Sequence, residues 1–244
     1  MCRRSGSEEA RMSEILLIRH AQASFRSVRY DRLSDLGVRQ AGILGDYLAR
    51  TGVRPDAAYS GTLKRQAHTA RTALARVFRD GDRPEARVAA EFDECEIPIT
   101  SQLPELLNAD PSLAQAVVTM ATDARSFHRV LEKAMARWMA GETGVAGRET
   151  WRDFARRAGA GIERVIAENG RGKRIAVFTS GGTIAAILQS VLGLADETAL
   201  RLALQIPNTS VSAVRYGGGR VSLASFNSIA HLEDRGEPGL VTYL

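Results

Sequence analysis

Apolar runs of strand length alternate along the chain with stretches of helical periodicity. Glu14–Ile18 and Arg174–Phe178 are short, largely apolar runs, typical of strands that are buried on both faces of a sheet, and Ala57–Tyr59 is a shorter run of the same kind. Apolar residues at helical spacing predict helices over about 35–52, 63–78 and 150–169, and another that ends at Leu192. This alternation predicts an α/β fold of three α/β/α layers with a mainly parallel sheet.

Residues 100–145 have a different pattern. Turn-forming residues at 108–112 interrupt short helical pieces there, so we expect a helical insertion that lies over the sheet as a cap. Further along, residues 210–216 and 220–226 have the pattern of two strands joined by a turn of three glycines, which predicts a hairpin.

Composition places the chain among globular proteins. Of its 244 residues, 44% are hydrophobic and 25% are charged, which is ordinary usage for a folded domain. The first twelve residues carry arginines without an apolar stretch behind them, unlike a secretory signal, and no apolar run approaches the ~18 residues that cross a bilayer. We therefore expect a cytoplasmic protein with one domain over residues 13–244, preceded by a disordered tail over 1–12.

The charge pattern is compatible with a small anionic substrate. The net charge is +5, and most basic residues are arginine, whose planar fork suits phosphate, although a general preference for arginine over lysine is the favoured explanation of the excess. The arginines are spread along the chain without interleaved aromatic residues, so the pattern predicts no nucleic-acid groove. The two cysteines, Cys2 and Cys95, give neither a disulfide framework nor a metal-ligand spacing.

Two polar segments that follow predicted strands are candidates for chemistry. Arg19 and His20 come directly after the first strand, at the sheet edge where ligands bind in open α/β folds. A neutral imidazole there can attack phosphorus, and an adjacent arginine can neutralise phosphoryl oxygens. Arg65 falls in the first turn of the helix after the second strand, where a cation opposes the helix dipole unless an anion lies between them. The alternatives, a structural histidine and an exposed arginine, stay open on these residues alone.

The two segments together resemble the histidine phosphatase superfamily, also called the phosphoglycerate mutase-like family. Arg19-His20-Ala21 is similar to the family's Arg-His-Gly, and Ser60–Ala70 is similar to its Ser-Pro-Leu-x-Arg-Ala-x-Gln-Thr-Ala pattern, with His68 at the glutamine. The resemblance runs from about Ile15 to Leu232 and implies a phosphoglycerate mutase-like fold. Further similar segments follow in the family's order: Asp31–Ala41, Gly147–Phe154, Ile206–Ser212 and Phe226–Leu232.

The resemblance implies roles for individual residues. His20 would be the nucleophile that carries the phosphoryl group, and Arg19 and Arg65 would bind its oxygens. The family's proton donor is a glutamate between the second arginine helix and the cap, and Glu94 is the best match for it. Three neighbouring acids remain alternatives: Glu91, Asp93 and Glu96. The resemblance implies chemistry without a metal ion or another cofactor.

One departure from the family pattern bears on activity. The family has a second catalytic histidine in a Ser-His-Gly-Gly context after the later strand, whereas this chain reads Thr179-Ser180-Gly181-Gly182. Ser180 could still donate a hydrogen bond to a phosphoryl oxygen, as could the N–H of Gly181 at the start of the helix. Loss of one transition-state donor typically costs about 10²–10³ in rate. No other histidine is an obvious replacement, although His68 could face the pocket.

The sequence thus predicts a phosphomonoesterase that acts on a small phosphorylated substrate through phosphohistidine. Gln22 and Arg26, just after the first motif, are further candidates for substrate contact. One alternative is a catalytically impaired relative that binds phosphorylated ligands or a protein, and another is a mutase of the phosphoglycerate type. We expect neither a nucleic acid nor a membrane as partner, and a homodimer paired through the late strands at 211–226 is one arrangement that the pattern allows.

Overall fold

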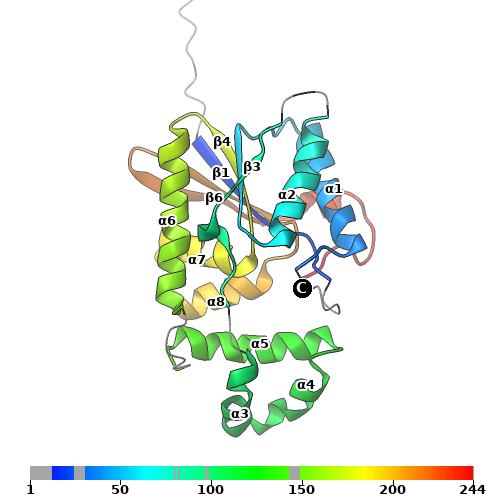
Figure 1. The fold of residues 1–244 in the computed structure, drawn as a ribbon, viewed down its shortest axis with the longest axis vertical. Coiled ribbons are helices and arrows are strands. Elements are labelled where there is room, and N and C mark those ends of the chain that lie inside the picture. The colour runs from blue at the N-terminus through cyan, green and yellow to red at the C-terminus, as the bar shows by residue number, and fades with distance from the viewer. Residues whose placement is uncertain are drawn as a thin grey trace, which may run out of the picture.

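The computed structural model describes residues 13–24, 31–79, 81, 83–96, 99–142 and 149–243. Its centre is a six-stranded sheet in the order β3-β2-β4-β1-β5-β6 (Figure 1). The first four of these strands pair in parallel, and β5 pairs antiparallel with both of its neighbours. The sheet is therefore mainly parallel, as the sequence predicts. The strand bounds are Ser13–Arg19 for β1, Ala57–Ser60 for β2, Ala86–Val88 for β3, Arg174–Thr179 for β4, Val211–Gly217 for β5 and Arg220–Ser228 for β6.

Alternate residues of the central strands pack against helices on opposite faces of the sheet, because successive side chains of a strand point to opposite sides. Leu16 and Ile18 pack with residues of α1 (Asp35–Arg50) and α2 (Lys64–Val77). Ile15 and Leu17 pack with residues of the second helical layer. That layer contains α6 (Trp151–Asn169), α7 (Gly181–Leu192) and α8 (Asp196–Gln205) (Figure 1). This alternation produces the predicted α/β/α layers.

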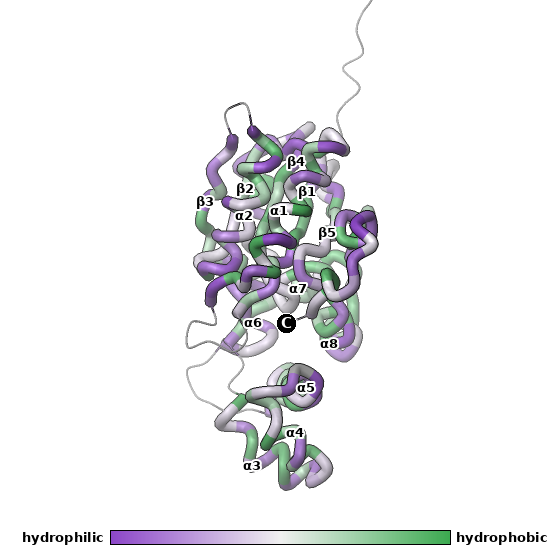
Figure 2. Tube along the Cα trace, turned by 90° about the vertical axis from the view of Figure 1, so that its right-hand side faces the viewer, coloured by the Kyte–Doolittle hydropathy of each residue, from purple (hydrophilic) through white to green (hydrophobic). Residues whose placement is uncertain are grey.

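The predicted helical insertion is present beyond one end of the sheet. It consists of α3 (Ile99–Ala109), the short helices η2 (Pro111–Leu113) and α4 (Ala114–Thr119), and α5 (Ala124–Met139). These helices have a small core of their own, formed by Leu106, Leu113, Ala116, Val130 and Ala134. Figures 1 and 2 show the insertion as a separate layer in which α5 lies nearest the sheet, and α5 packs against α8 and α6. We call this layer the cap.

Two short elements complete the described part of the chain: the 3-10 helix η1 (Ala90–Phe92) and the helix α9 (Ala230–Glu233). The strands β5 and β6 form the predicted hairpin, whose turn uses Gly218 and Gly219 at positive φ (58° and 74°), a conformation that glycine adopts without steric cost. No helix in the described ranges is both long and apolar enough to span a bilayer.

Candidate active site

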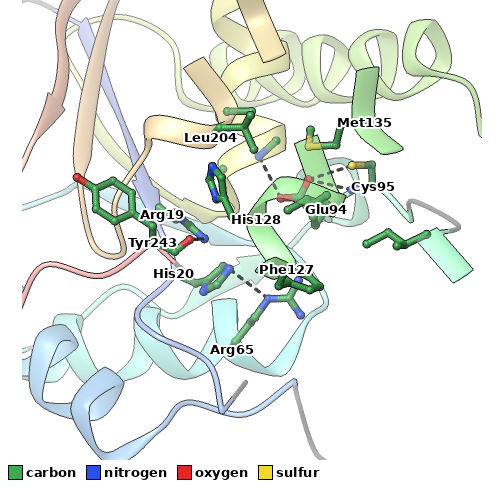
Figure 3. Close-up of a pocket in the computed structure, with 15 residues that line it drawn as sticks. Arg19, His20, Arg65, Glu94, Cys95, Phe127, His128, Met135, Leu204 and Tyr243 are labelled. Carbon is green, nitrogen blue, oxygen red and sulfur yellow. Dashed lines mark hydrogen bonds between the residues drawn. The ribbon is translucent and has the colours of Figure 1, made fainter. Parts of the chain in front are cut away.

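Three parallel strands bring the polar segments together at one edge of the sheet. β1 ends at Arg19, β2 leads into α2 with Arg65, and β4 leads into α7 with Gly181. Since the carboxyl ends of parallel strands share one edge, these residues converge there on a cavity of about 230 Å³ (Figure 3). This volume is below the ~300–1,000 Å³ of pockets for drug-sized ligands, so the cavity suits a small molecule. Its polar lining consists of Arg19, His20, Arg65, Glu94 and His128, with Gly181 and Gly182.

His20 is held as a neutral imidazole by a hydrogen bond at each of its two ring nitrogens. Its Nδ1 donates to the carbonyl oxygen of Ala21 (2.8 Å), and its Nε2 accepts a hydrogen bond from Nε of Arg65 (3.2 Å). Burial, followed by the nearby charges of Arg19 and Arg65, lowers the pKa of His20 well below its usual value of 6.5. The imidazole therefore stays unprotonated at neutral pH with its Nε2 lone pair on the arginine side, as a nucleophile requires.

Arg65 is fixed by a carboxylate for which the sequence predicts no individual role. Its guanidinium makes a salt bridge to Asp31 (3.0 Å), and Asp31 also accepts from the backbone N–H of Lys64 (2.9 Å). The N-cap residue of α2, Leu63, has no side-chain acceptor, so Asp31 caps this helix from outside. The sequence predicts an anion between the N-terminus of α2 and the guanidinium of Arg65. In the structure, the carboxylate of Asp31 occupies this position.

Arg19 lies against the start of α7. Its guanidinium donates to the carbonyl oxygens of Tyr243 (2.8 Å) and Ile206. A Cβ placed on Gly181 would lie 3.7 Å from Nε of Arg19, so this arginine borders the first turn of α7. An anion at this point would meet the guanidinium and the N-terminus of a twelve-residue helix together, and both favour negative charge.

Among the four acidic candidates, the structure places only Glu94 in the cavity lining. Its two oxygens accept hydrogen bonds from the backbone N–H groups of Gly182 and Cys95, both at 3.0 Å. A Cβ on Gly182 would lie 2.3 Å from a Glu94 oxygen, so the Glu94 side chain would have to move if this residue were larger than glycine. Elsewhere, Glu91 pairs with Arg164 of α6 (2.6 Å), Asp93 accepts from the Thr62 hydroxyl (2.7 Å), and Glu96 does not line the cavity.

Ser180 does not line the cavity, contrary to its predicted place among the substrate contacts. It is fully buried, and its hydroxyl oxygen accepts a hydrogen bond from the side-chain amide of Gln66 (2.9 Å). The same amide donates to the carbonyl oxygen of Phe92 (3.0 Å). Gln66 stands where the family pattern has the alanine after the second arginine. Because Gln66 fills this space, a histidine introduced at position 180 would have to displace it.

The remaining predicted contacts fall outside the cavity or outside the described residues. The side chain of Gln22 accepts a hydrogen bond (2.7 Å) from the hydroxyl of Ser34, the N-cap of α1, and does not line the cavity. Arg26 lies outside the described residues. His68 is half-buried on α2 and is absent from the lining, whereas His128 of the cap is part of it. The sequence pattern of α5 predicts which residues share a helix face with His128, but it does not predict which part of the molecule that face covers, so His128 could not be identified from the sequence.

A buried histidine supports the backbone beside the nucleophile. Thr209 has φ 60°, a left-handed conformation that is unusual for a β-branched residue, and its backbone N–H donates to the carbonyl oxygen of Arg19 (3.2 Å). Its hydroxyl donates to the carbonyl oxygen of Asn208 and accepts from Nε2 of His231 (2.9 Å). Burial lowers the pKa of His231 to about 4. The neutral imidazole is therefore part of the native packing here.

This histidine predicts a loss of stability in acid. Since the pKa of His231 is about 4 in the folded chain and near 6.5 in the unfolded chain, only the unfolded chain binds the proton between these values. The stabilisation is complete above pH 6.5 and is lost as the pH falls toward 4, by up to about 3 kcal/mol. Urea unfolding at several pH values should show a shallower pH dependence for His231→Asn than for the unchanged chain. Equal slopes for the two would contradict the assignment.

Within the residues that the structure describes, no three His, Cys, Asp or Glu side chains gather in a way that could hold a metal ion.

Comparisons with known proteins agree with this architecture. Three similar solved structures are a phosphoglycerate mutase from Bacillus anthracis str. Sterne (19% identity, TM-score 0.65), a phosphoserine phosphatase mutant from Entamoeba histolytica in complex with phosphoserine (18%, 0.62) and a mycobacterial glucosyl-3-phosphoglycerate phosphatase in complex with VO3 (21%, 0.62). The matches cover 93%, 91% and 88% of this chain and 98%, 100% and 98% of the other chains, respectively. At these identities the likeness concerns the fold. None of the curated proteins matches the chain.

The family itself is shown by the sequence. A family model described as histidine phosphatase superfamily (branch 1) matches residues 15–103 and 117–229, which include β1 with its Arg-His pair, α2, and the β4–α7 junction. Neighbours in structure include both phosphatases and a mutase of the same fold. The chain therefore belongs to the histidine phosphatase superfamily, branch 1.

Proposed function

We propose that this chain is a phosphomonoesterase that hydrolyses a small phosphorylated substrate through a phosphohistidine at His20. The observation that carries the proposal is the state of His20: a neutral imidazole whose Nε2 lies next to Arg65 in a cavity that Arg19 also lines. An arginine pair at a nucleophile stabilises the charge that develops on the phosphoryl oxygens during transfer.

The reaction has two steps. In the first, Nε2 of His20 bonds to phosphorus, the bond to the ester oxygen breaks, and the carboxylic acid of Glu94 gives its proton to the leaving alcohol. In the second, the Glu94 carboxylate takes a proton from water, the water oxygen bonds to phosphorus, and the bond to Nε2 breaks. Phosphate leaves, and both His20 and Glu94 return to their starting states. Arg19, Arg65 and the N–H of Gly181 bind the phosphoryl oxygens in both steps.

A second candidate function is supported by Ser180. Since its hydroxyl is buried against Gln66, the family's second histidine has no counterpart at that position, and a protein that only binds phosphorylated ligands would fit this loss. Hydrolysis of p-nitrophenyl phosphate in the presence of EDTA, followed by trapping of labelled phosphohistidine, separates the two. Turnover with a trapped intermediate supports the enzyme, whereas phosphate binding without turnover supports the binding protein.

The cap side of the cavity favours an ester of an apolar alcohol. Apart from Cys95 and Tyr243, the lining beyond the polar group around His20 is apolar: Ile99, Phe127, Leu131, Met135, Ala203 and Leu204. Apolar lining of this kind gains free energy from burial of hydrocarbon, and its own side chains form no hydrogen bond with a carboxylate or amine, which would lose part of its hydration there.

This lining predicts a substrate preference. We expect 2-phenylethyl phosphate to be hydrolysed with at least ~10-fold higher kcat/KM than phosphoserine, because both are alkyl esters but only the first has an apolar alcohol. Leu131→Ala should lower kcat/KM for 2-phenylethyl phosphate by roughly 10-fold and leave that for phosphoserine nearly unchanged. Steady-state kinetics with both esters test this. A preference for phosphoserine would rule out the apolar assignment without affecting the phosphohistidine mechanism.

A further inference from the structure

One of the two arginines that line the cavity is already paired with a carboxylate. Arg65 is paired with Asp31 (3.0 Å), and the Glu94 carboxyl group lines the same cavity. A phosphomonoester brings up to two negative charges, and the histidine that would help to balance them in the family pattern is Ser180 here. The buried hydroxyl of Ser180 is bonded to Gln66 and does not reach the cavity lining. A further donor is therefore needed if transfer is to be efficient.

The cap presents one polar side chain to this cavity. His128 lies on the face of α5 that also carries Phe127, Leu131 and Met135, and all four line the cavity. Figure 3 shows its imidazole over the cavity into which His20, Arg19 and Glu94 also project. His128 is half-buried, and it makes no hydrogen bond to another described residue. Its ring N–H groups are thus directed at neither a helix terminus nor a carboxylate within the described ranges.

We propose that His128 is a catalytic residue that donates a hydrogen bond to a phosphoryl oxygen from the cap side, in place of the donor missing at position 180. An imidazole suits this work because it can donate through either ring nitrogen. The proposal rests on the proposed function, since it concerns the same phosphoryl group. It means that the donors come from two sides of the cavity, with Arg19 at the end of β1 and Arg65 at the start of α2 on one side and His128 of the cap on the other.

A packing role or a contact with the alcohol alone would give different results for His128. If it were a packing residue of α5, its loss would affect the stability of the cap and little else. If it only contacted the alcohol of the substrate, its loss would change the preference among esters but not the binding of an anion that has no alcohol. Orthovanadate separates these cases because it imitates the phosphoryl group in transfer and carries no organic part.

The test compares His128→Ala with His68→Ala, a matched control because His68 is also half-buried but lies outside the cavity. We expect His128→Ala to weaken orthovanadate binding, measured by calorimetry, by at least ~10-fold and to lower kcat for p-nitrophenyl phosphate by roughly 10²-fold. His68→Ala should change neither by more than ~3-fold. Orthovanadate affinity in His128→Ala within ~3-fold of the unchanged chain would overturn the proposal, whatever the effect on kcat.

Two further measurements distinguish the loss of the His128 contact from unfolding of the cap. Thermal unfolding of each variant shows whether the cap still folds, and His128→Asn, which retains an N–H donor but no charge, replaces His128→Ala if the alanine variant is unfolded. If the unchanged chain binds orthovanadate but hydrolyses no ester, the proposed function fails while the calorimetric comparison still decides whether His128 contacts the anion.

Discussion

His20→Ala should abolish hydrolysis of p-nitrophenyl phosphate, with a fall in kcat of roughly 10⁴-fold or more, because it removes the atom that forms the covalent intermediate. No labelled phosphohistidine should be trapped in this variant. The measurement is a steady-state assay with EDTA present, together with acid-labile label on the protein. Since Arg19 and Arg65 remain, the variant should still bind phosphate.

The control for this prediction is a test of whether the His20→Ala protein still folds. His20 is almost fully buried, and its side chain bonds to the Ala21 carbonyl and to Arg65, so its removal leaves a small void and a guanidinium with one contact fewer. A near-native melting temperature shows that lost activity is chemical. Activity within ~10-fold of the unchanged chain in a folded His20→Ala protein would show that another group is the nucleophile.

Glu94→Gln should separate the two steps of the reaction. Glutamine keeps the size of the side chain at the start of α7 but can neither give nor take the proton, so we expect kcat to fall by about 10²–10⁴-fold. p-Nitrophenolate leaves without a proton, so the first step should persist with p-nitrophenyl phosphate while hydrolysis of phosphohistidine slows. Rapid-quench kinetics should therefore show a burst of p-nitrophenol close to one equivalent of enzyme, with labelled phosphohistidine accumulating.

Glu91→Gln is the matched control, because Glu91 is a neighbouring glutamate that pairs with Arg164 outside the cavity. It should retain kcat within ~3-fold and show no burst. If Glu94→Gln loses the burst as well as turnover, Glu94 is needed before the covalent intermediate forms. If it retains full turnover, the proton donor is a different residue, and the assignment of Glu94 is wrong.

The sequence was sufficient to predict the sheet and the convergence of Arg19, His20 and Arg65. Each of these residues follows a strand of the parallel sheet, and the topology of such a sheet brings strand ends together whatever the details of packing. The starts of α1 and α6 are also local features, because the N-cap side chains of Ser34 and Thr150 each accept a hydrogen bond from the third residue of their helix. Local sequence determines such positions almost entirely.

Other features of the site depend on contacts between distant segments. Ser180 turns away from the cavity because Gln66, on a different helix, supplies the partner of its hydroxyl. Asp31 reaches Arg65 across a span of 34 residues. His128 enters the cavity because α5 packs against α8, and no motif in α5 indicates that neighbour. Such side-chain positions depend on how whole helices and strands pack together, so the pattern of residues within one segment cannot predict them.

The left-handed backbone of Thr209, next to the nucleophile, affects how the protein loses activity in acid. A β-branched side chain at φ 60° costs of order 1–3 kcal/mol, and Thr209 is kept there by His231 on one side and by the chain that carries His20 on the other. Protonation of that histidine leaves its Nε2–H bond to Thr209 in place but puts a charge into a buried site that supports the costly turn. Acid inactivation should therefore begin with a local loosening around the reaction centre, while the helices at the periphery are still intact.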